Sequence, residues 1–390
     1  MQRGIAIMPL DTGHVPRWLF ERMVKLTRMI VIEMVSEYGP DEFIKRISDP
    51  VWFQSLSCVI GMDWNSSGTT TITTGALKQA LKGLEKDLGI FICGGKGKTS
   101  RKTPEEIQNW AGVLGLPSSS AEALVYNSRM SAKVDSALVQ DGYQIYHHNF
   151  FFSKSGAWAV IQQGMNTMTQ TARRYHWYSE KITDIILEPH SGIVSQRRVP
   201  TLNLVAKKSQ NVQKISVALV QGGYRGLMKD VRILRRRVSK LSRTITIGFR
   251  GERSTLLKLE NRDFFWHPVL LEDLSRSRYL ERILAYLCER KPANYEALLS
   301  EKGVGPKTVR ALSLISELIY GAQASYEDPA RYCFAHGGKD NIPYPIDRST
   351  YDASIDFFQR VIQKTKIPFS EKRRMLQRIR GKNNPGEYER

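Results

Sequence analysis

The chain has 390 residues, of which 41% are hydrophobic, and its 58 Lys and Arg against 38 Asp and Glu give a formal net charge of +20. This length predicts two or three domains, and the hydrophobic content is high enough for packed cores, which excludes an intrinsically disordered chain. The positive charge favours a polyanionic partner, and because no lipidation motif accompanies it, we expect DNA rather than a membrane surface.

Helix and strand patterns alternate in the first half of the chain. Apolar residues at three- and four-residue steps predict a helix over Trp18–Tyr38, which Gly39 and Pro40 end. A second helix is expected over Thr74–Leu88, and a short strand over residues 88–92 follows it.

The rest of the first half predicts one more helix and a hairpin. In KTPEEIQNWAGVLG we expect Thr103 to cap a helix with Pro104 at its first position. Residues 141–163 contain two aromatic and β-branched runs joined by SKSG, which predicts a β-hairpin. The N-terminal region is therefore expected to be α+β, whereas leucines and isoleucines at helical spacing beyond Pro268 predict a helical C-terminal domain.

Charge marks the expected boundaries between these regions. Residues 207 to 260 carry fourteen Lys and Arg against three acids, including Arg235, Arg236 and Arg237, which we expect to contact DNA. The predicted organisation is an α+β domain over residues 1–206, a basic connecting region over 207–262, a helical helix-hairpin-helix domain over 263–380 and a frayed tail over 381–390.

The run GGKGKTS at residues 94 to 100 resembles a phosphate-binding loop after a strand. A P-loop would need a glycine at position 92, where Ile92 stands, and a helix starting at the threonine. Nucleotide hydrolysis is thus the less favoured alternative, and we expect a basic surface loop in which Lys96, Lys98 and Arg101 contact phosphates.

The stretch ARRYHWYSEK, residues 172 to 181, interleaves cations with rings. Arg173 and Arg174 beside Tyr175 and Trp177 would suit single-stranded or distorted nucleic acid, because cations meet phosphates and rings stack on bases. An aromatic edge of the core explains the same pattern equally well.

Acids and histidines in the first half could hold a divalent metal for a nuclease. Asp135, Asp141 and His148 are the candidate ligands, and turn or capping roles are the alternative because no spacing among them is diagnostic. Outside the nuclease hypothesis we expect no metal and no cofactor. No apolar run reaches the roughly 18 residues that span a bilayer, and no signal peptide is evident, so we expect a cytoplasmic protein without a membrane contact.

The segment LSEKGVGPKTVRAL, residues 299 to 312, predicts a helix-hairpin-helix. Two helical patterns flank a Gly-Val-Gly turn, and the amides that open the second helix would bind one phosphate. The residues expected at this phosphate are Lys302, Gly303, Val304, Gly305, Lys307 and Thr308.

GVGPKTVRAL resembles the hairpin of the helix-hairpin-helix superfamily of DNA glycosylases. Its bifunctional members carry a lysine where Lys307 stands and an aspartate in a Pro-h-Asp context, which Asp347 matches. The resemblance implies that Lys307 attacks C1′ of the sugar to form a Schiff base while Asp347 stabilises the cationic state.

A larger resemblance covers most of residues 1 to 350. Four segments are similar to motifs of the prokaryotic, largely archaeal family called domain of unknown function 763: MPLDTGHVPRWLFERMVKL, GGKGKTSR, ARRYHWYS and FAHGGKDNIPYPIDR. The sequence as a whole predicts a DNA-binding protein of repair or genome maintenance, with glycosylase or lyase chemistry at Lys307 and Asp347. The alternatives are a metal-dependent structure-specific nuclease and a non-enzymatic nucleic-acid-binding protein.

Overall fold

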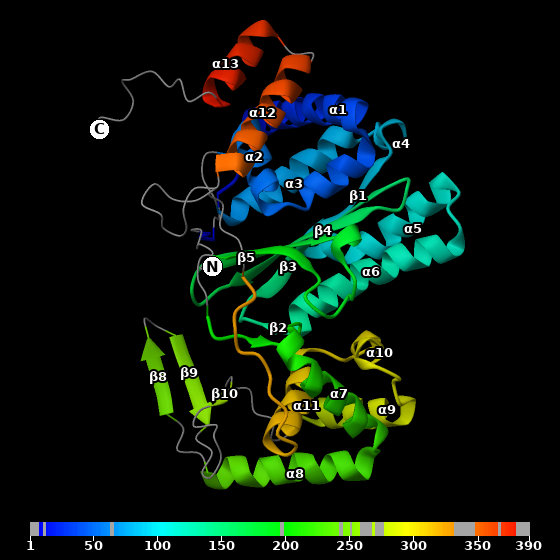
Figure 1. The fold of residues 1–390 in the computed structure, drawn as a ribbon, viewed down its shortest axis with the longest axis vertical. Helices are drawn as coiled ribbons and strands as arrows, with labels where there is room; N and C mark the ends of the chain where they lie inside the picture. Colours follow the sequence, from blue (N-terminus) through cyan, green and yellow to red (C-terminus); the bar gives the residue numbers. More distant parts are fainter. Residues whose placement is uncertain are drawn as a thin grey trace.

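A computed structural model gives the fold (Figure 1). The structure describes residues 8–10, 13–62, 66–195, 199–241, 245–249, 252–257, 267–269, 277–330, 348–365 and 368–379. It is a mixed α/β protein in which an antiparallel sheet lies between two layers of helices, and helices form the described C-terminal part.

The main sheet has five antiparallel strands in the order β1-β3-β4-β5-β6. Their bounds are β1 (Ile90–Lys96), β3 (Gln144–Ser153), β4 (Trp158–Asn166), β5 (Thr171–Tyr178) and β6 (His190–Ser195). The predicted hairpin is confirmed as β3 and β4, and the SKSG turn joins them with Gly156 at φ +95°. Because β1, β3, β4 and β5 each contribute residues to two hydrophobic clusters, one on each face, the sheet separates two hydrophobic cores.

One face of the sheet packs against N-terminal helices. They are α1 (Arg17–Ile47), α2 (Pro50–Ile60), α3 (Ser67–Leu81) and α4 (Glu85–Leu88), and α12 (Arg348–Lys364) and α13 (Phe369–Ile379) lie outside them. Phe151 of β3 faces this core, where Trp52 of α2 stacks on Phe358 of α12 at a centroid distance of 5.8 Å. The C-terminal helices therefore complete the N-terminal core.

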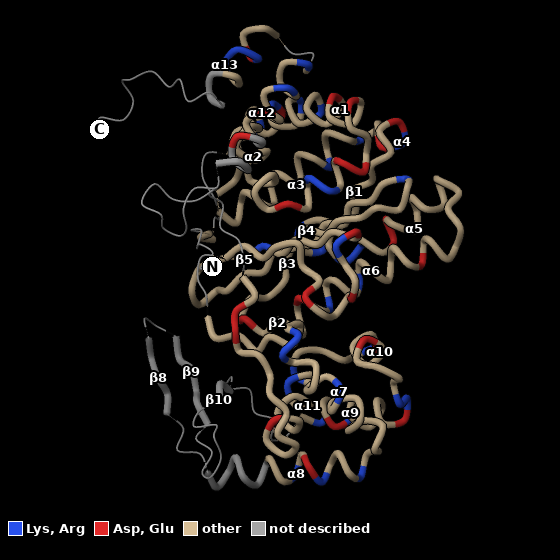
Figure 2. Tube along the Cα trace, in the orientation of Figure 1, with Lys and Arg blue, Asp and Glu red and all other residues tan. Residues whose placement is uncertain are grey.

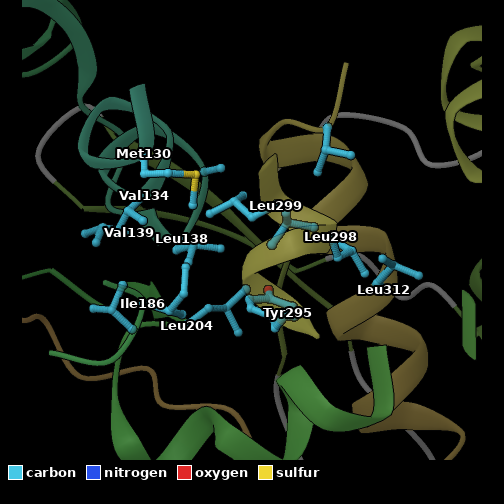
Figure 3. Packing of buried hydrophobic residues seen from close by; sticks show 14 of the residues in the cluster. Met130, Val134, Leu138, Val139, Ile186, Leu204, Tyr295, Leu298, Leu299 and Leu312 are labelled. Carbon is cyan, nitrogen blue, oxygen red and sulfur yellow. The ribbon is translucent and has the colours of Figure 1, made fainter. Parts of the chain in front are cut away.

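The opposite face packs against α5 (Thr103–Leu114) and α6 (Ser118–Ala137). Phe150 and Phe152 of β3 enter this second core. The core continues into a helical unit, made of α7 (Gln210–Gln221), α8 (Tyr224–Leu241), α9 (Arg278–Arg290), α10 (Tyr295–Ser300) and α11 (Pro306–Leu318). These residues belong to one buried cluster, and Figure 3 shows Leu299 of this unit on the side that faces Leu138, with Leu298 and Leu312 further inside the helical unit.

Short strands complete the description. β2 (Val139–Gln140) pairs with β7 (Leu202–Asn203), and β8 (Ile245–Phe249), β9 (Glu252–Leu257) and β10 (His267–Val269) form a separate three-stranded sheet. The chain after α11 runs along β7, where the amide of Asn203 donates to the carbonyl of Ser325 over 2.8 Å. That strap brings residues near 328 back to the main sheet.

Two of the expected helices differ in their bounds from those observed. α1 continues to Ile47, but Gly39 has φ +81° and ψ +166°, so the Gly-Pro pair breaks the helix as predicted and a second segment follows the break. The helix expected to begin at Thr74 begins at Ser67, since Ser66 and Thr69 form a capping box there. The helix expected from Thr103 is confirmed, but Thr103 is its first residue and not its cap. No side chain caps this helix, and the Thr103 hydroxyl donates to the carbonyl of Ser100 over 2.7 Å.

Candidate nucleic-acid interface

The turn between α10 and α11, residues 301–305, is held tightly against α9. Gly303 has φ +87°, and a Cβ on it would lie 2.6 Å from Cδ1 of Ile283. Val304 is buried, and its amide donates to the carbonyl of Glu301. The fold therefore requires glycine at position 303, for both its backbone angle and the space it leaves.

Gly305 has a different environment. Its backbone is extended, with φ −147°, and a Cβ there would meet nothing within 4 Å. It is the N-cap of α11, and no side chain caps that helix. Lys302 and Lys307 are exposed on either side of it, so an anion can approach the positive end of the α11 dipole.

Helix α6 fixes the position of this turn. The Nζ atom of Lys133 donates to the carbonyls of Leu299 (2.5 Å) and Glu301 (2.6 Å), where the C-terminal carbonyls of α10 lack partners within the helix. Burial lowers the pKa of Lys133, and the nearby Glu301 opposes that shift. Gln140, just after α6, donates to the carbonyl of Pro306 over 3.0 Å. The turn is thus held from both sides, by α9 and by α6.

No local sequence pattern identifies Lys133 and Gln140 as anchors of this turn. They are separated from it by 166 to 168 residues, and only the tertiary fold brings them together. A lysine near a helix end is common enough that its partner cannot be inferred from local pattern.

The interleaved stretch on β5 is buried. Arg173, Arg174, Tyr175 and Trp177 are each 0% exposed, so no base can stack on these rings and no phosphate reaches these cations in this structure. The alternative interpretation, an aromatic edge of the core, describes their position. The alternation of a strand places Arg174 on one face of the sheet and the other three on the opposite face.

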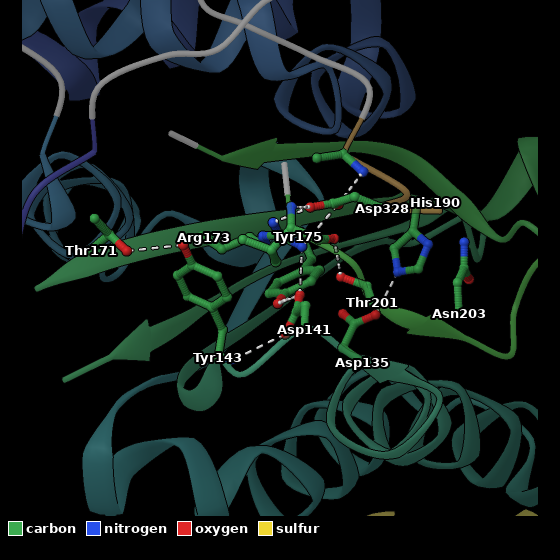
Figure 4. A network of polar contacts seen from close by, with 12 residues as sticks. Asp135, Asp141, Tyr143, Thr171, Arg173, Tyr175, His190, Thr201, Asn203 and Asp328 are labelled. Atoms are coloured by element: carbon green, nitrogen blue, oxygen red, sulfur yellow. Dashed lines mark hydrogen bonds and ion pairs between the residues drawn. The ribbon is translucent and has the colours of Figure 1, made fainter. Parts of the chain in front are cut away.

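Arg173 is neutralised inside the protein (Figure 4). Its guanidinium donates to Asp141 over 2.8 Å and forms a bidentate ion pair with Asp328, with Nη1 to Oδ1 at 3.1 Å and Nη2 to Oδ2 at 2.7 Å. Burial lowers the pKa of Arg173, but the two aspartates outweigh that effect and raise it. Asp328 comes from the strap after α11, which this ion pair ties to the sheet.

Arg174 lies against α2 and α3. Its Nε atom donates to His176 over 2.9 Å, its Nη1 atom donates to Thr70 over 3.2 Å, and its guanidinium lies 4.3 Å from the ring centroid of Phe53. Burial lowers its pKa to about 9, with the thiol of Cys58 opposing.

The three candidate metal ligands are also buried and hydrogen-bonded. Asp135 accepts from Gln162 (2.5 Å) and from Trp177 (3.0 Å), and its other oxygen contacts Nε2 of His190 at 2.5 Å. Asp141 accepts from Tyr175 over 2.6 Å.

His148 joins the same network through Gln162. The Gln162 amide nitrogen donates to Asp135, so its oxygen accepts from Nδ1 of His148 at 2.9 Å, and Nε2 of His148 then accepts from the hydroxyl of Ser128. Burial lowers the pKa of His148 to about 4, with Gln162 opposing, so the ring is neutral at pH 7. Among the described residues, no group of three or more His, Cys, Asp and Glu side chains could hold a metal ion.

The glycine-rich run lies at the edge of the sheet. It forms the end of β1 and a 3₁₀ turn over Gly97–Lys102, and Lys96, Lys98 and Arg101 are exposed there. A Cβ at Gly94 would lie 2.2 Å from the carbonyl oxygen of His148, so that glycine serves packing between strands.

Comparison with protein families identifies the chain. The model of the family described as "Protein of unknown function (DUF763)" matches residues 4–346. The chain belongs to the DUF763 family. Comparisons with curated proteins and with solved structures found no match.

The match places the turn at 301–305 inside the DUF763 region and ends one residue before Asp347. Asp347 lies outside the residues that the structure describes. Arg235, Arg236 and Arg237 lie on the second half of α8, and the described side chains of that helix include exposed Arg225, Lys229 and Arg232.

Lys and Arg of the DUF763 protein are distributed over both helical layers (Figure 2). Net charge alone therefore does not locate an interface, and the geometry at the α11 N-terminus is the more specific signal. No helix in the described part of the chain has both the length and the apolar composition that a bilayer crossing needs.

Proposed function

We propose that this DUF763 protein binds DNA in repair or genome maintenance, with residues 295–318 acting as a helix-hairpin-helix that clamps one phosphate. The observation that carries the proposal is the contrast between Gly303 and Gly305. The fold explains Gly303, whose Cβ would collide with Ile283, but it leaves Gly305 in an ordinary extended conformation beside open space. A close approach of an external group is a reason for glycine at that position.

Exposed cations support the same assignment. Lys302 and Lys307 flank the opening, and the formal charge of +20 would draw DNA toward the protein. Phosphate contacts of this kind carry no sequence information, so the clamp would orient the protein on DNA rather than select a sequence.

Gly305→Ser is the sharpest test of the clamp. Serine is at least as good an N-cap as glycine, so we expect an unchanged or slightly raised unfolding midpoint. Its hydroxyl would accept from the amides that the phosphate needs, and we expect DNA affinity to fall about tenfold, or about 1.4 kcal/mol. Electrophoretic mobility shift across a salt series, with thermal unfolding in parallel, measures both.

Charge variants provide the matched control. Lys302→Ala and Lys307→Ala should each weaken binding and reduce the salt slope by about 1, because each removes one phosphate contact. Lys25→Ala removes the same charge from α1, on the other side of the sheet, and should leave the slope unchanged. Absence of DNA binding at low salt, or equal losses in all three lysine variants, would refute the clamp.

Lyase chemistry at Lys307 and Asp347 is a second proposal. It is favoured by the position of Lys307, an exposed residue in the first turn of α11, next to the turn at which the DNA would be held. An attacking amine is commonly activated by desolvation or a nearby cation, and closure of DNA over Lys307 would have to supply this. Borohydride trapping on abasic-site DNA tests it: a covalent complex that Lys307→Ala abolishes is expected, and its absence removes the proposal.

A further inference from the structure

Beside the turn, α9 presents a partly exposed aromatic ring. Tyr279 is 48% exposed, and its hydroxyl donates to the carbonyl of Gly303 over 3.0 Å. The hydroxyl also lies 3.1 Å from the position that a Gly303 Cβ would take. The ring is therefore anchored to the same turn that offers Gly305 and the start of α11.

One arginine of α9 lies over this ring and another precedes it in the sequence. The guanidinium of Arg282 lies 5.4 Å from the Tyr279 ring centroid, and Arg278 is exposed on the preceding position of α9. The opposite side of α9 is buried through Ile283 and Leu284, so the helix has a fixed orientation. A tyrosine with an exposed ring and a tethered hydroxyl, next to arginines, has the composition of a base-stacking platform.

We propose that Tyr279 stacks on an unpaired base of the nucleic acid whose phosphate the turn binds. The inference rests on the proposed function and adds the class of partner. In an intact duplex each base is stacked on its neighbours, and a protein ring reaches a base face only where the strand is single or distorted. The protein therefore prefers single-stranded or distorted DNA to an intact duplex.

The anchoring bond makes the platform specific to this position. A hydroxyl donated to Gly303 restricts rotation of the ring and sets its distance from the clamped phosphate. An aromatic side chain with few rotatable bonds loses little entropy when a base stacks on it. The neighbouring arginines add attraction for phosphates on either side of the stacked base.

Two variants at position 279 separate stacking from anchoring. Tyr279→Leu keeps apolar bulk but removes the aromatic face, and Tyr279→Phe keeps the face but removes the hydroxyl. Because stacking on one base contributes about 1–3 kcal/mol, we expect Tyr279→Leu to weaken single-strand binding about 5- to 150-fold and duplex binding less than about twofold. Tyr279→Phe should keep most of the single-strand affinity.

Fluorescence anisotropy with one oligonucleotide, as a single strand and as a duplex, gives the readout, and Gly305→Ser is the reference variant. We expect the wild type to bind the single strand more tightly than the duplex. Tyr279→Leu should lose affinity for the single strand selectively, and Gly305→Ser should lose affinity for both substrates. The stacking proposal is overturned if the wild type binds the single strand and the duplex with equal affinity. It is also overturned if Tyr279→Leu loses affinity equally for both substrates or loses none. Neither result contradicts the phosphate clamp. A loss in Tyr279→Phe as large as in Tyr279→Leu assigns the residue to anchoring and also overturns the stacking proposal. A wild type that binds neither substrate removes the clamp and the platform together.

Discussion

Arg173 and its two aspartates link the middle of the sheet to the strap after α11. Both oxygens of Asp328 face the guanidinium, and they also accept from the amides of Val199 and Ala330, each over 2.9 Å. Breaking a buried ion pair by removing one partner typically costs about 3–5 kcal/mol, because the remaining charge stays buried. Asp328→Ala should lower the free energy of unfolding by that amount, measured by urea denaturation; a loss below about 1 kcal/mol would contradict the structural role.

Buried histidines predict sensitivity to acid. Burial lowers the pKa of His148 to about 4. Burial also lowers the pKa of His147 to about 3, and the nearby His148 and Lys96 add to that shift. The pKa of His176 lies well below its usual value, again because the side chain is buried. As the pH falls below about 6.5, these histidines bind protons in the unfolded chain but not in the folded chain. The free energy of unfolding is therefore highest near neutral pH and decreases toward pH 4.

His148→Gln tests this pH dependence. Glutamine can still donate toward Gln162 and accept from Ser128, and it does not titrate. We expect the slope of unfolding free energy against pH to fall by about 1.4 kcal/mol per pH unit between about pH 6 and pH 4.5. Urea denaturation at several pH values measures it, and a slope equal to that of the wild type would show that His148 is not neutral in the folded state.

At the scale of elements, local signals predicted part of the fold. The Gly-Pro break at residue 39, the Thr-Pro start of α5 and the SKSG turn depend on the backbone angles that glycine and proline allow, so the local sequence was sufficient to predict them. The start of α3 was missed because SSGTTTITTGA has low helix propensity, and the capping box and burial between α1 and the sheet compensate.

Burial of polar residues could not be predicted in the same way. A run of Arg, His and Tyr has the composition of a surface, and only Asp141, Asp135 and Asp328, from other elements, make its burial on β5 possible. Those partners are 32 to 155 residues away in sequence. The candidate interface was predicted in its local part, the glycines and lysines of the turn, but its supports on α6 and α9 were not.

Lys133 provides the test of those supports. Its Nζ atom donates to the carbonyls of Leu299 and Glu301 at the end of α10, next to the turn at residues 301–305. Lys133→Met keeps the apolar stem and removes two charge-assisted bonds, so we expect a loss of about 1.5–3 kcal/mol in stability. DNA affinity should fall although Lys133 is not a phosphate ligand. Because the side chain makes no phosphate contact, the salt slope should stay at the wild-type value, in contrast to Lys302→Ala; a reduced slope would make Lys133 a direct contact.

At the scale of the whole molecule, one hydrophobic core joins the sheet to the helical unit that carries the turn. Leu138 and Leu204 from the sheet region, and Leu298 and Leu299 from α10, belong to the same buried cluster, as Figure 3 shows. The turn at residues 301–305 therefore belongs to a unit that is packed on the sheet rather than linked to it by a flexible connection. A shared core predicts that sheet and helical unit unfold together.

Leu299→Ala tests this coupling. Truncating a fully buried leucine should cost about 2–5 kcal/mol, and in a shared core the loss moves the whole transition. Tryptophan fluorescence, which includes Trp177 and Trp158 in the sheet, and far-ultraviolet circular dichroism, which reports mainly helix, should shift to the same lower urea midpoint. Ile30→Val in the other core is a milder control that should also shift both probes together. If Leu299→Ala moves only the dichroism signal and leaves tryptophan fluorescence at the wild-type midpoint, the helical unit unfolds independently, and the clamp would then be free to move relative to the sheet.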